Sequence, residues 1–216
     1  MGWWFGAGAA LLALVCVFIA RIFLVLRRNE TQEPRKRGSA SILVVVGSGG
    51  HTSEILRLVG SLSASYAPRH YVIAETDRMS EDKVRTLEAA RTEGGSEPQY
   101  TIHRIPRSRE VRQSWASSVV STLYALLYSI PLVFQLKPDM VLCNGPGTCV
   151  PPCISALLLR ILGMKKVLII YIESICRVET LSLSGKILYS LSDYFFVQWP
   201  TLKKKYPKAV FLGRLV

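Results

Sequence analysis

Residues 41–55 read SILVVVGSGGHTSEI and predict a strand, a glycine loop and a helix in direct succession. The apolar, β-branched run 42–46 is typical of a buried strand, and a helical pattern begins at Glu54. Glycines let a ligand approach the backbone closely, and a helix N-terminus presents free N–H groups to an anion. His51 follows the glycines directly, and an imidazole titrates near neutral pH. The stretch therefore predicts an anion site beside a residue suited to proton transfer.

This loop departs from two well-known nucleotide-binding loops. It lacks the Gly-Lys-Ser/Thr ending of a P-loop, which argues against hydrolysis of ATP or GTP. Thr52 stands where a dinucleotide-binding fingerprint has its third glycine, although Glu75 and Asp77 lie near the expected distance for the acidic residue. Dinucleotide binding therefore stays open as the less favoured alternative.

Downstream of the loop, apolar runs alternate with helical patterns to the end of the sequence. Apolar strands separated by helices indicate a parallel sheet that is covered on both faces. The expected strands are 41–46, 70–74, 101–105, 139–143, 166–172, 194–198 and 209–212, and the expected helices are 51–63, 80–91, 115–136, 149–163, 183–191 and 201–205. Residues 92–99 should form an exposed connector. The predicted fold class is α/β, with a Rossmann-like parallel sheet.

In such a sheet, ligands bind where loops gather at the carboxyl ends of the strands. Three further loops should join the first glycine loop there: 105–113 with three arginines, 144–148 with the sequence NGPGT, and 173–180 with the sequence ESICRVET. Glu173 directly follows a very apolar strand, which is a usual position for a functional carboxylate. The gathered loops would combine anion-binding backbone, positive side chains and a candidate base.

Residues 1–28 are expected to be a transmembrane anchor. Residues 3–20 carry no charge, and the apolar run resumes after Arg21, whose side chain can reach the headgroups. Basic residues follow at positions 27, 28, 35, 36 and 37, so the positive-inside rule places the remainder of the chain in the cytosol. A cleaved signal peptide is the alternative. Residues 29–40 are then a basic linker, and residues 41–216 form the folded domain.

Charge and cysteine content agree with a cytosolic domain at a membrane. A net charge of +12 suits an anionic membrane or a diphosphate ligand better than nucleic acid, because the basic residues are scattered and form no nucleic-acid-binding motif. The 5 cysteines, at positions 16, 143, 149, 153 and 176, form no CxxC pair, which indicates reduced thiols. No Asp-x-Asp pair or histidine cluster points to a metal.

A second uncharged stretch runs from Ser114 to Leu136. We expect a buried or membrane-lying helix here and not a second span, because the strands before and after it must lie on the same side of the membrane.

Six segments carry a resemblance to a known family. They read ILVVVGSGGHTSEILRL, RHYVIAETD, HRIPRSREVRQSW, VLCNGPGTCVPPCISALLL, YIESICRVETLSLSGKILYSLSDYFFVQWP and FLGRLV. Across residues 22–216 the chain resembles the asparagine-linked glycosylation protein 14 homologues, the membrane subunits of the two-part UDP-N-acetylglucosamine transferase of the dolichol pathway. It is also similar to the N-terminal half of the bacterial transferase that glycosylates the undecaprenyl-linked peptidoglycan precursor. The bacterial pattern has Gln and Asn where this chain has Ser174 and Ile175.

The resemblance implies one half of a B-type glycosyltransferase, the acceptor-binding half, with a soluble UDP-sugar-binding subunit as its partner. The implied reaction adds the second N-acetylglucosamine to dolichyl-diphosphate-N-acetylglucosamine, with inversion, on the cytosolic face of the endoplasmic reticulum. The preceding enzyme of the pathway is a further candidate partner. No cofactor or metal is implied.

The implied transfer needs a base for the acceptor hydroxyl, and His51 and Glu173 are the two candidates. The residues expected to bind substrate are Gly47, Ser48, Gly49, Gly50, Thr52, Asn144, Gly145, Gly147, Ser174, Arg177 and Glu179.

Two other functions stay open. The chain is alternatively a non-catalytic scaffold that recruits a soluble catalytic subunit, or a membrane-tethered NAD-dependent dehydrogenase. The glycine loop, His51 and Glu173 favour catalysis, because a scaffold needs none of them. The apolar end 211–216 either completes this domain's own sheet or reaches the partner, and the resemblance favours the partner for the final residues.

Overall fold

The computed structural model describes residues 12, 15–25, 38–92, 99–110 and 112–216. The expected connector 92–99 and linker 29–40 lie almost entirely outside these residues, as does much of the expected anchor 1–28.

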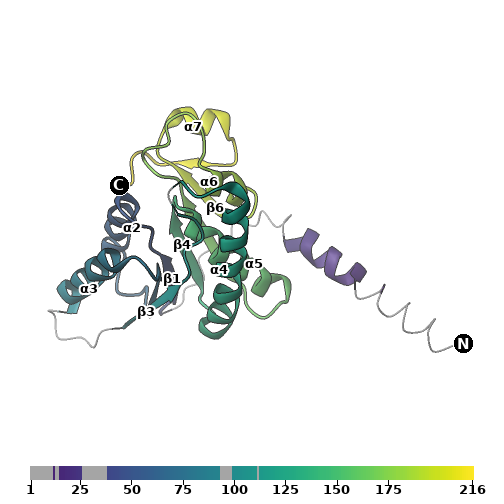
Figure 1. Ribbon diagram of the computed structural model, residues 1–216, viewed down its shortest axis with the longest axis horizontal. Coiled ribbons are helices and arrows are strands. Elements are labelled where there is room, and N and C mark those ends of the chain that lie inside the picture. Colours follow the sequence, from purple (N-terminus) through teal and green to yellow (C-terminus); the bar gives the residue numbers. More distant parts are fainter. Residues whose placement is uncertain (1–11, 13–14, 26–37, 93–98, 111) are drawn as a thin grey trace, which may run out of the picture.

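A parallel sheet of seven strands forms the centre of the domain (Figure 1). The strands are β1 Ile42–Val45, β2 Arg69–Ala74, β3 Tyr100–Ile105, β4 Met140–Asn144, β5 Leu168–Ile172, β6 Tyr194–Val197 and β7 Val210–Phe211. Their order is β3-β2-β1-β4-β5-β6-β7, and β1 lies between β2 and β4, with Ile42 opposite Arg69 and Met140. All seven expected strands and the α/β fold class are confirmed, because buried parallel strands leave an unbroken apolar signal in the sequence.

Helices cover both faces of this sheet (Figure 1). They are α2 Gly50–Gly60, α3 Arg78–Thr92, α4 Trp115–Leu136, α5 Val150–Ile161, α6 Leu183–Leu188 and α7 Pro200–Lys205, with a short 3-10 turn at Gly147–Cys149. Residues of α2 and α3 form one apolar core with β1 and β2, and residues of α4 to α7 form the other core. The expected helices are therefore confirmed, with ends that differ by a few residues.

Helix α4 buries only one narrow stripe of side chains and exposes an apolar face. Small and polar side chains form its inner stripe, namely Ser118, Ala125, Ser129 and Val133. Large side chains point outward along its first two-thirds: Trp115, Val119, Val120, Leu123, Tyr124, Leu127 and Tyr128 are all exposed. The expectation of a buried helix at residues 115–136 is therefore wrong, and the expectation of a membrane-lying helix stays a prediction. Within the described part of the chain, α4 is the one helix long and apolar enough to cross a membrane, yet it lies alongside the sheet (Figure 1).

An apolar helix is described at Val15–Val25, N-terminal to the domain. Arg21 joins it to the domain, because its Nε donates to the carbonyl oxygen of Ile161 at 2.9 Å. A Cβ at Gly163 would lie 2.3 Å from the Arg21 guanidinium, so the glycine makes room for this contact. Arg21 thus caps the C-terminus of α5, where a cation is favoured.

The C-terminal residues fold back on their own domain. The N–H groups of Leu215 and Val216 donate to Oε1 of Gln198 at 3.1 and 3.3 Å, and Leu215 packs against the core beside α2. Leu212, in contrast, is 67% exposed. The segment 211–216 is expected from the sequence either to complete this domain or to reach the partner. For Leu215 and Val216, the structure shows contacts within this domain.

Candidate active site

A cavity of about 770 Å³ lies at the carboxyl ends of the strands. The expected loops all contribute to it, and its lining also includes the start of α6. The lining residues are Ser48, Gly50, His51, Glu54, Arg107, Arg109, Glu110, Arg112, Gly145, Pro146, Gly147, Glu173, Ser174, Cys176, Arg177, Ser182, Leu183 and Ser184. The sheet edge therefore brings together residues more than 130 positions apart in the sequence.

The N-terminus of α2 opens into this cavity. Gly49 precedes the helix with φ 65° and offers no side chain to cap it, and the first turn contains no acidic residue. A Cβ at Gly50 would meet no atom within 4 Å, and the same holds for Gly147 across the cavity. The first-turn N–H groups and the open space above them suit an anion.

His51 is the titratable group at the centre of this arrangement. Its Nδ1 lies 3.3 Å from Oδ1 of Asn144 and 4.0 Å from a carboxylate oxygen of Glu54. Its side chain is 33% exposed, so the ring is both held and accessible. A Cβ at Gly145 would lie 2.5 Å from Cε1 of His51, so the second glycine loop leaves space for the ring.

Glu173 is placed differently from His51, since its side chain is fully buried. Its carboxylate accepts hydrogen bonds from the N–H groups of Ser174 and Ser182 and from the Ser182 hydroxyl, at 3.0 to 3.1 Å. Burial raises the pKa of the Glu173 carboxyl, and these hydrogen bonds offset the rise only in part. In this position Glu173 holds the ends of the loop 174–182 together.

Thr52 and Gly47 support the loop from behind and do not line the cavity. The Thr52 hydroxyl donates to the Gly47 carbonyl oxygen and lies 2.7 Å from the Ser80 hydroxyl. Asp77 accepts from the N–H and hydroxyl of Ser80 at 3.1 and 2.7 Å, which caps α3. Of the two carboxylates expected for a dinucleotide ribose, Asp77 is thus engaged within the protein, and Glu75 is exposed.

The other expected substrate-binding residues divide into two groups. Ser48, Gly50, Gly145, Gly147, Ser174 and Arg177 line the cavity. Asn144 is fully buried beneath it, Gly49 shapes the turn before α2, and Glu179 is exposed on the loop after β5 without lining the cavity.

Glu54 is a central residue that the sequence analysis did not select. Its carboxylate accepts from Nδ2 of Asn144 at 3.0 Å, from the Ser174 hydroxyl at 2.9 Å and from the Ile175 N–H at 3.3 Å. One carboxylate thereby joins α2 to the loops after β4 and β5. The available signal was its position three residues after His51, on the same face of α2.

The loop 105–113 contributes four further cavity residues, Arg107, Arg109, Glu110 and Arg112. With Arg177, the cavity lining contains four arginines, together with the glutamates Glu54, Glu110 and Glu173. The guanidinium of Arg109 also lies 4.5 Å from the ring centroid of Trp115, which links the cavity rim to the exposed face of α4.

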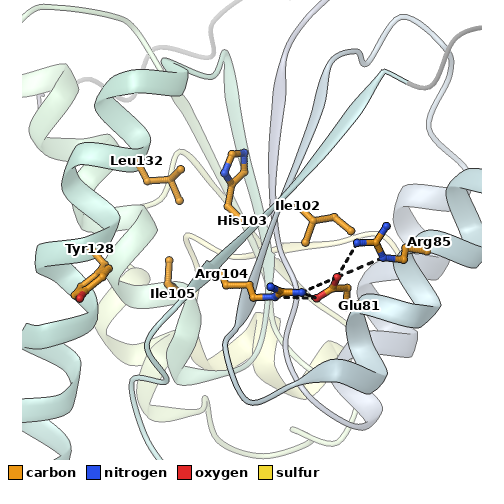
Figure 2. A pocket seen from close by; sticks show the side chains of 8 residues that line it. All are labelled: Glu81, Arg85, Ile102, His103, Arg104, Ile105, Tyr128 and Leu132. Atoms are coloured by element: carbon orange, nitrogen blue, oxygen red, sulfur yellow. Dashed lines mark hydrogen bonds and ion pairs between the residues drawn. The ribbon is translucent and has the colours of Figure 1, made fainter.

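A second hollow of about 420 Å³ lies beside the edge strand β3, between α3 and α4 (Figure 2). Its charged residues pair with one another, because Glu81 accepts from both Arg85 and Arg104. Among the described residues, no cluster of three or more His, Cys, Asp and Glu side chains is arranged to hold a metal ion in either place.

The family of this chain follows from comparison with known proteins. The family model described as "Oligosaccharide biosynthesis protein Alg14 like" matches residues 42–215. The chain belongs to the Alg14 family. Among curated Alg14 proteins, it is 65% identical to the rat UDP-N-acetylglucosamine transferase subunit ALG14, with 94% of each chain covered. It is 63% identical to the human subunit of the same name, with 96% of this chain and 97% of the human protein covered.

The Alg14 fold also resembles a solved bacterial structure. MurG from Acinetobacter baumannii superposes with a TM-score of 0.52 at 17% identity, over 76% of this chain and 42% of that chain. The chain thus spans about two-fifths of the MurG chain, and the likeness at this identity concerns the fold alone.

Proposed function

We propose that this chain is the acceptor-binding, membrane-associated subunit of a UDP-N-acetylglucosamine transferase. In this role it helps to add the second N-acetylglucosamine to dolichyl-diphosphate-N-acetylglucosamine at the cytosolic face of the endoplasmic reticulum membrane. The observation that carries the proposal is the single cavity that joins His51, an open helix N-terminus and four arginines. Family membership and the names of the rat and human relatives support a role in a UDP-N-acetylglucosamine transferase.

The acceptor diphosphate would bind at the basic side of this cavity. The N–H groups of the first turn of α2 attract an anion, and Arg107, Arg109, Arg112 and Arg177 add positive charge nearby. Arginine suits phosphate because its guanidinium can donate two parallel hydrogen bonds to one group. The sugar of the acceptor would then extend toward His51.

His51 would act as the general base. Its imidazole would take the proton from the acceptor hydroxyl, whose oxygen attacks the anomeric carbon of the donor sugar from the side opposite UDP, which inverts that carbon. Glu173 is the less suitable base, because its oxygens are already engaged by backbone N–H groups and its side chain is fully buried. We assign Glu173 the role of holding the loop 174–182 in place.

The exposed face of α4 would lie on the membrane beside the cavity. Trp115 begins this face and contacts Arg109 at the cavity rim, so an interfacial lipid carrying a diphosphate meets both surfaces together. Tryptophan and tyrosine favour the headgroup region, and arginine favours anionic lipid. This arrangement keeps the membrane-lying option for residues 115–136. The N-terminal anchor 1–28 remains part of the proposal, with its orientation taken from the flanking charges.

A second polypeptide would supply the UDP-sugar site. The rat and human relatives, each matched along at least 94% of their length, are named as subunits. The scaffold alternative also requires this second polypeptide, but it differs from the proposal because it assigns no catalytic role to the cavity of this chain.

The test is turnover of the reconstituted complex, in detergent or vesicles, with His51→Ala and Glu173→Gln compared with the unchanged chain. Loss of a general base costs about 10²–10⁴-fold in rate, and we expect that loss for His51→Ala at equal complex concentration. Glu173→Gln should lower the thermal unfolding midpoint as well as turnover. Turnover of His51→Ala equal to that of the unchanged complex would favour the scaffold.

A further inference from the structure

The hydrogen bonds of Glu54 determine which way the Asn144 side chain faces. A carboxylate only accepts hydrogen bonds, so the amide group 3.0 Å from Glu54 must be the NH₂ end of Asn144. The carbonyl oxygen of Ile172 lies 3.4 Å from the same nitrogen and also only accepts. The flipped amide is thus excluded, because the Asn144 amide oxygen would then face the Glu54 carboxylate and the Ile172 carbonyl oxygen, neither of which can donate a hydrogen bond.

This orientation turns the amide oxygen of Asn144 toward His51. Oδ1 lies 3.3 Å from Nδ1 of the imidazole, and an amide oxygen can only accept. Nδ1 must therefore carry the hydrogen in the neutral ring. A carboxylate oxygen of Glu54 lies 4.0 Å from Nδ1 and favours a hydrogen there as well. In a neutral imidazole with hydrogen on Nδ1, Nε2 holds the free lone pair.

We propose that Glu54 is a positioning residue which, through Asn144, holds His51 in the Nδ1–H tautomer and leaves Nε2 as the basic nitrogen. The inference rests on the proposed role of His51 as the general base. The packing of the site is consistent with such a relay, because the Asn144 side chain is fully buried and that of Glu54 is only 11% exposed. Buried partners with fixed hydrogen bonds hold an amide in one orientation.

Glu54 has a second set of contacts that the test must separate from the relay. The same carboxylate accepts from Ser174 and Ile175 and so holds the loop after β5. Removing Glu54 would disturb that loop as well as the imidazole. A loss of turnover alone therefore does not identify the relay.

Two variants separate these roles. Glu54→Met keeps the length of the side chain but removes its acceptors, so that only the weaker contact to the Ile172 carbonyl oxygen, at 3.4 Å, still favours the observed orientation of Asn144. Adding Asn144→Asp restores an oxygen that faces His51 in either orientation, since both ends of a carboxylate accept, although its second oxygen then faces the Ile172 carbonyl oxygen. The double variant Glu54→Met/Asn144→Asp therefore restores the tautomer without restoring the contacts to Ser174 and Ile175. Glu54→Gln is the conservative variant, because its amide oxygen still accepts from Asn144.

The direct measurement is ¹⁵N NMR of the full chain in detergent with labelled histidine, at about pH 8.5 where imidazoles are neutral. The chain contains 3 histidines, and substitutions of His70 and His103 assign the remaining signals to His51. We expect hydrogen on Nδ1 of His51 in the unchanged chain and in Glu54→Gln, an increased population of the Nε2–H form in Glu54→Met, and recovery in the double variant. Hydrogen on Nε2 in the unchanged chain, or an unaltered tautomer in Glu54→Met, would overturn the proposal.

Turnover in the reconstituted complex is the second readout. An incorrect tautomer lowers kcat, so we expect Glu54→Met to lose about 10–10²-fold and the double variant to regain part of that loss. A double variant with the restored tautomer but no gain in kcat would overturn the relay as a contributor to catalysis. Full turnover in His51→Ala would instead overturn the base assignment while the tautomer assignment stands, so the two failures are distinguishable.

Discussion

The imidazole of His51 lies so close to Gly145 that a Cβ at this glycine would come within 2.5 Å of Cε1 and 2.7 Å of Nδ1. Gly145 also has φ +72°, a conformation that other residues adopt only with strain. The glycine of the second loop is thus fitted to the histidine that follows the first loop. This contact explains why two glycine loops so far apart in the sequence belong to one site.

Gly145→Ala should displace the His51 ring and lower kcat by about 10²-fold, because the added methyl group occupies the space of the imidazole. The matched control is Gly213→Ala, since Gly213 has φ +90° but nothing within 4 Å of an added Cβ. The two variants share backbone strain and differ in the clash. The measurement is steady-state kinetics of the reconstituted complex. An equal loss of kcat in both variants would contradict the prediction.

Gly50→Ala should weaken acceptor binding without destabilising the domain. The added Cβ would meet no protein atom and would point into the space expected for the diphosphate, so KM for the acceptor should rise about tenfold. Gly60→Ala, at the other end of the same helix, is the control. Helix propensity improves or stays unchanged in both variants. An unchanged KM for Gly50→Ala would place the acceptor elsewhere.

Leu127→Glu should impair use of a membrane-bound acceptor only. Its side chain is 67% exposed on α4, and losing its burial in lipid costs roughly 1.5–3 kcal/mol, which corresponds to at least a tenfold rise in KM. With a short-chain, water-soluble acceptor the kinetics should stay unchanged. Ala90→Glu on the exposed surface of α3 serves as the charge-matched control. Equal KM values for both variants in vesicles would argue against membrane contact at α4.

The buried ion pair between Arg69 and Glu88 should dominate the acid sensitivity of the fold. Burial pushes the pKa of Glu88 upward, but the hydrogen bonds from Arg69 and Tyr71 outweigh burial and hold the pKa below its ordinary value of 4.5. A carboxyl whose pKa is lower in the folded state adds stability that is complete above 4.5. That stability is lost as the pH falls through the folded-state pKa.

Glu88→Gln should therefore reduce the free energy of unfolding at pH 7 by about 3 kcal/mol and flatten its fall with acid below pH 4.5. Glu81→Gln is the comparison, because its partners Arg85 and Arg104 are 57% and 59% exposed and the expected cost is under about 1 kcal/mol. Denaturant titrations across pH measure both effects. If the free energy of unfolding fell equally steeply with acid in Glu88→Gln and in the unchanged chain, Glu88 would not be the source of the acid sensitivity.

Leu212→Asp should release the partner subunit while leaving the domain intact, because the apolar Leu212 side chain is 67% exposed and its neighbour Phe211 is exposed as well. Deletion of Arg214 to Val216 should release the partner and, unlike Leu212→Asp, lower the free energy of unfolding by about 1–3 kcal/mol. The deletion removes the two N–H groups that donate to the buried Gln198 oxygen. Co-purification of the partner, with circular dichroism of each variant, separates the two effects. A partner that stays bound to both variants would place its docking surface elsewhere.

By itself, the sequence determined the α/β class, all seven strands and the loops that form the site. These features leave local signals: strands such as 42–45 and 168–172 are apolar and uninterrupted, and turns such as 47–50 and 145–147 need glycine. The family is recognisable for the same reason, since its motifs lie in these short segments.

Only the tertiary structure decided what each polar residue does. Glu173 and Glu54 have the same chemistry, but Glu173 is fully buried against backbone N–H groups, whereas Glu54 faces Asn144 and His51 at the cavity. The exposed face of α4 was equally undetermined, because its periodicity does not show which stripe meets the sheet. Burial and hydrogen-bond partners depend on segments about 90 to 120 residues away, and such distances have no local pattern in a single sequence.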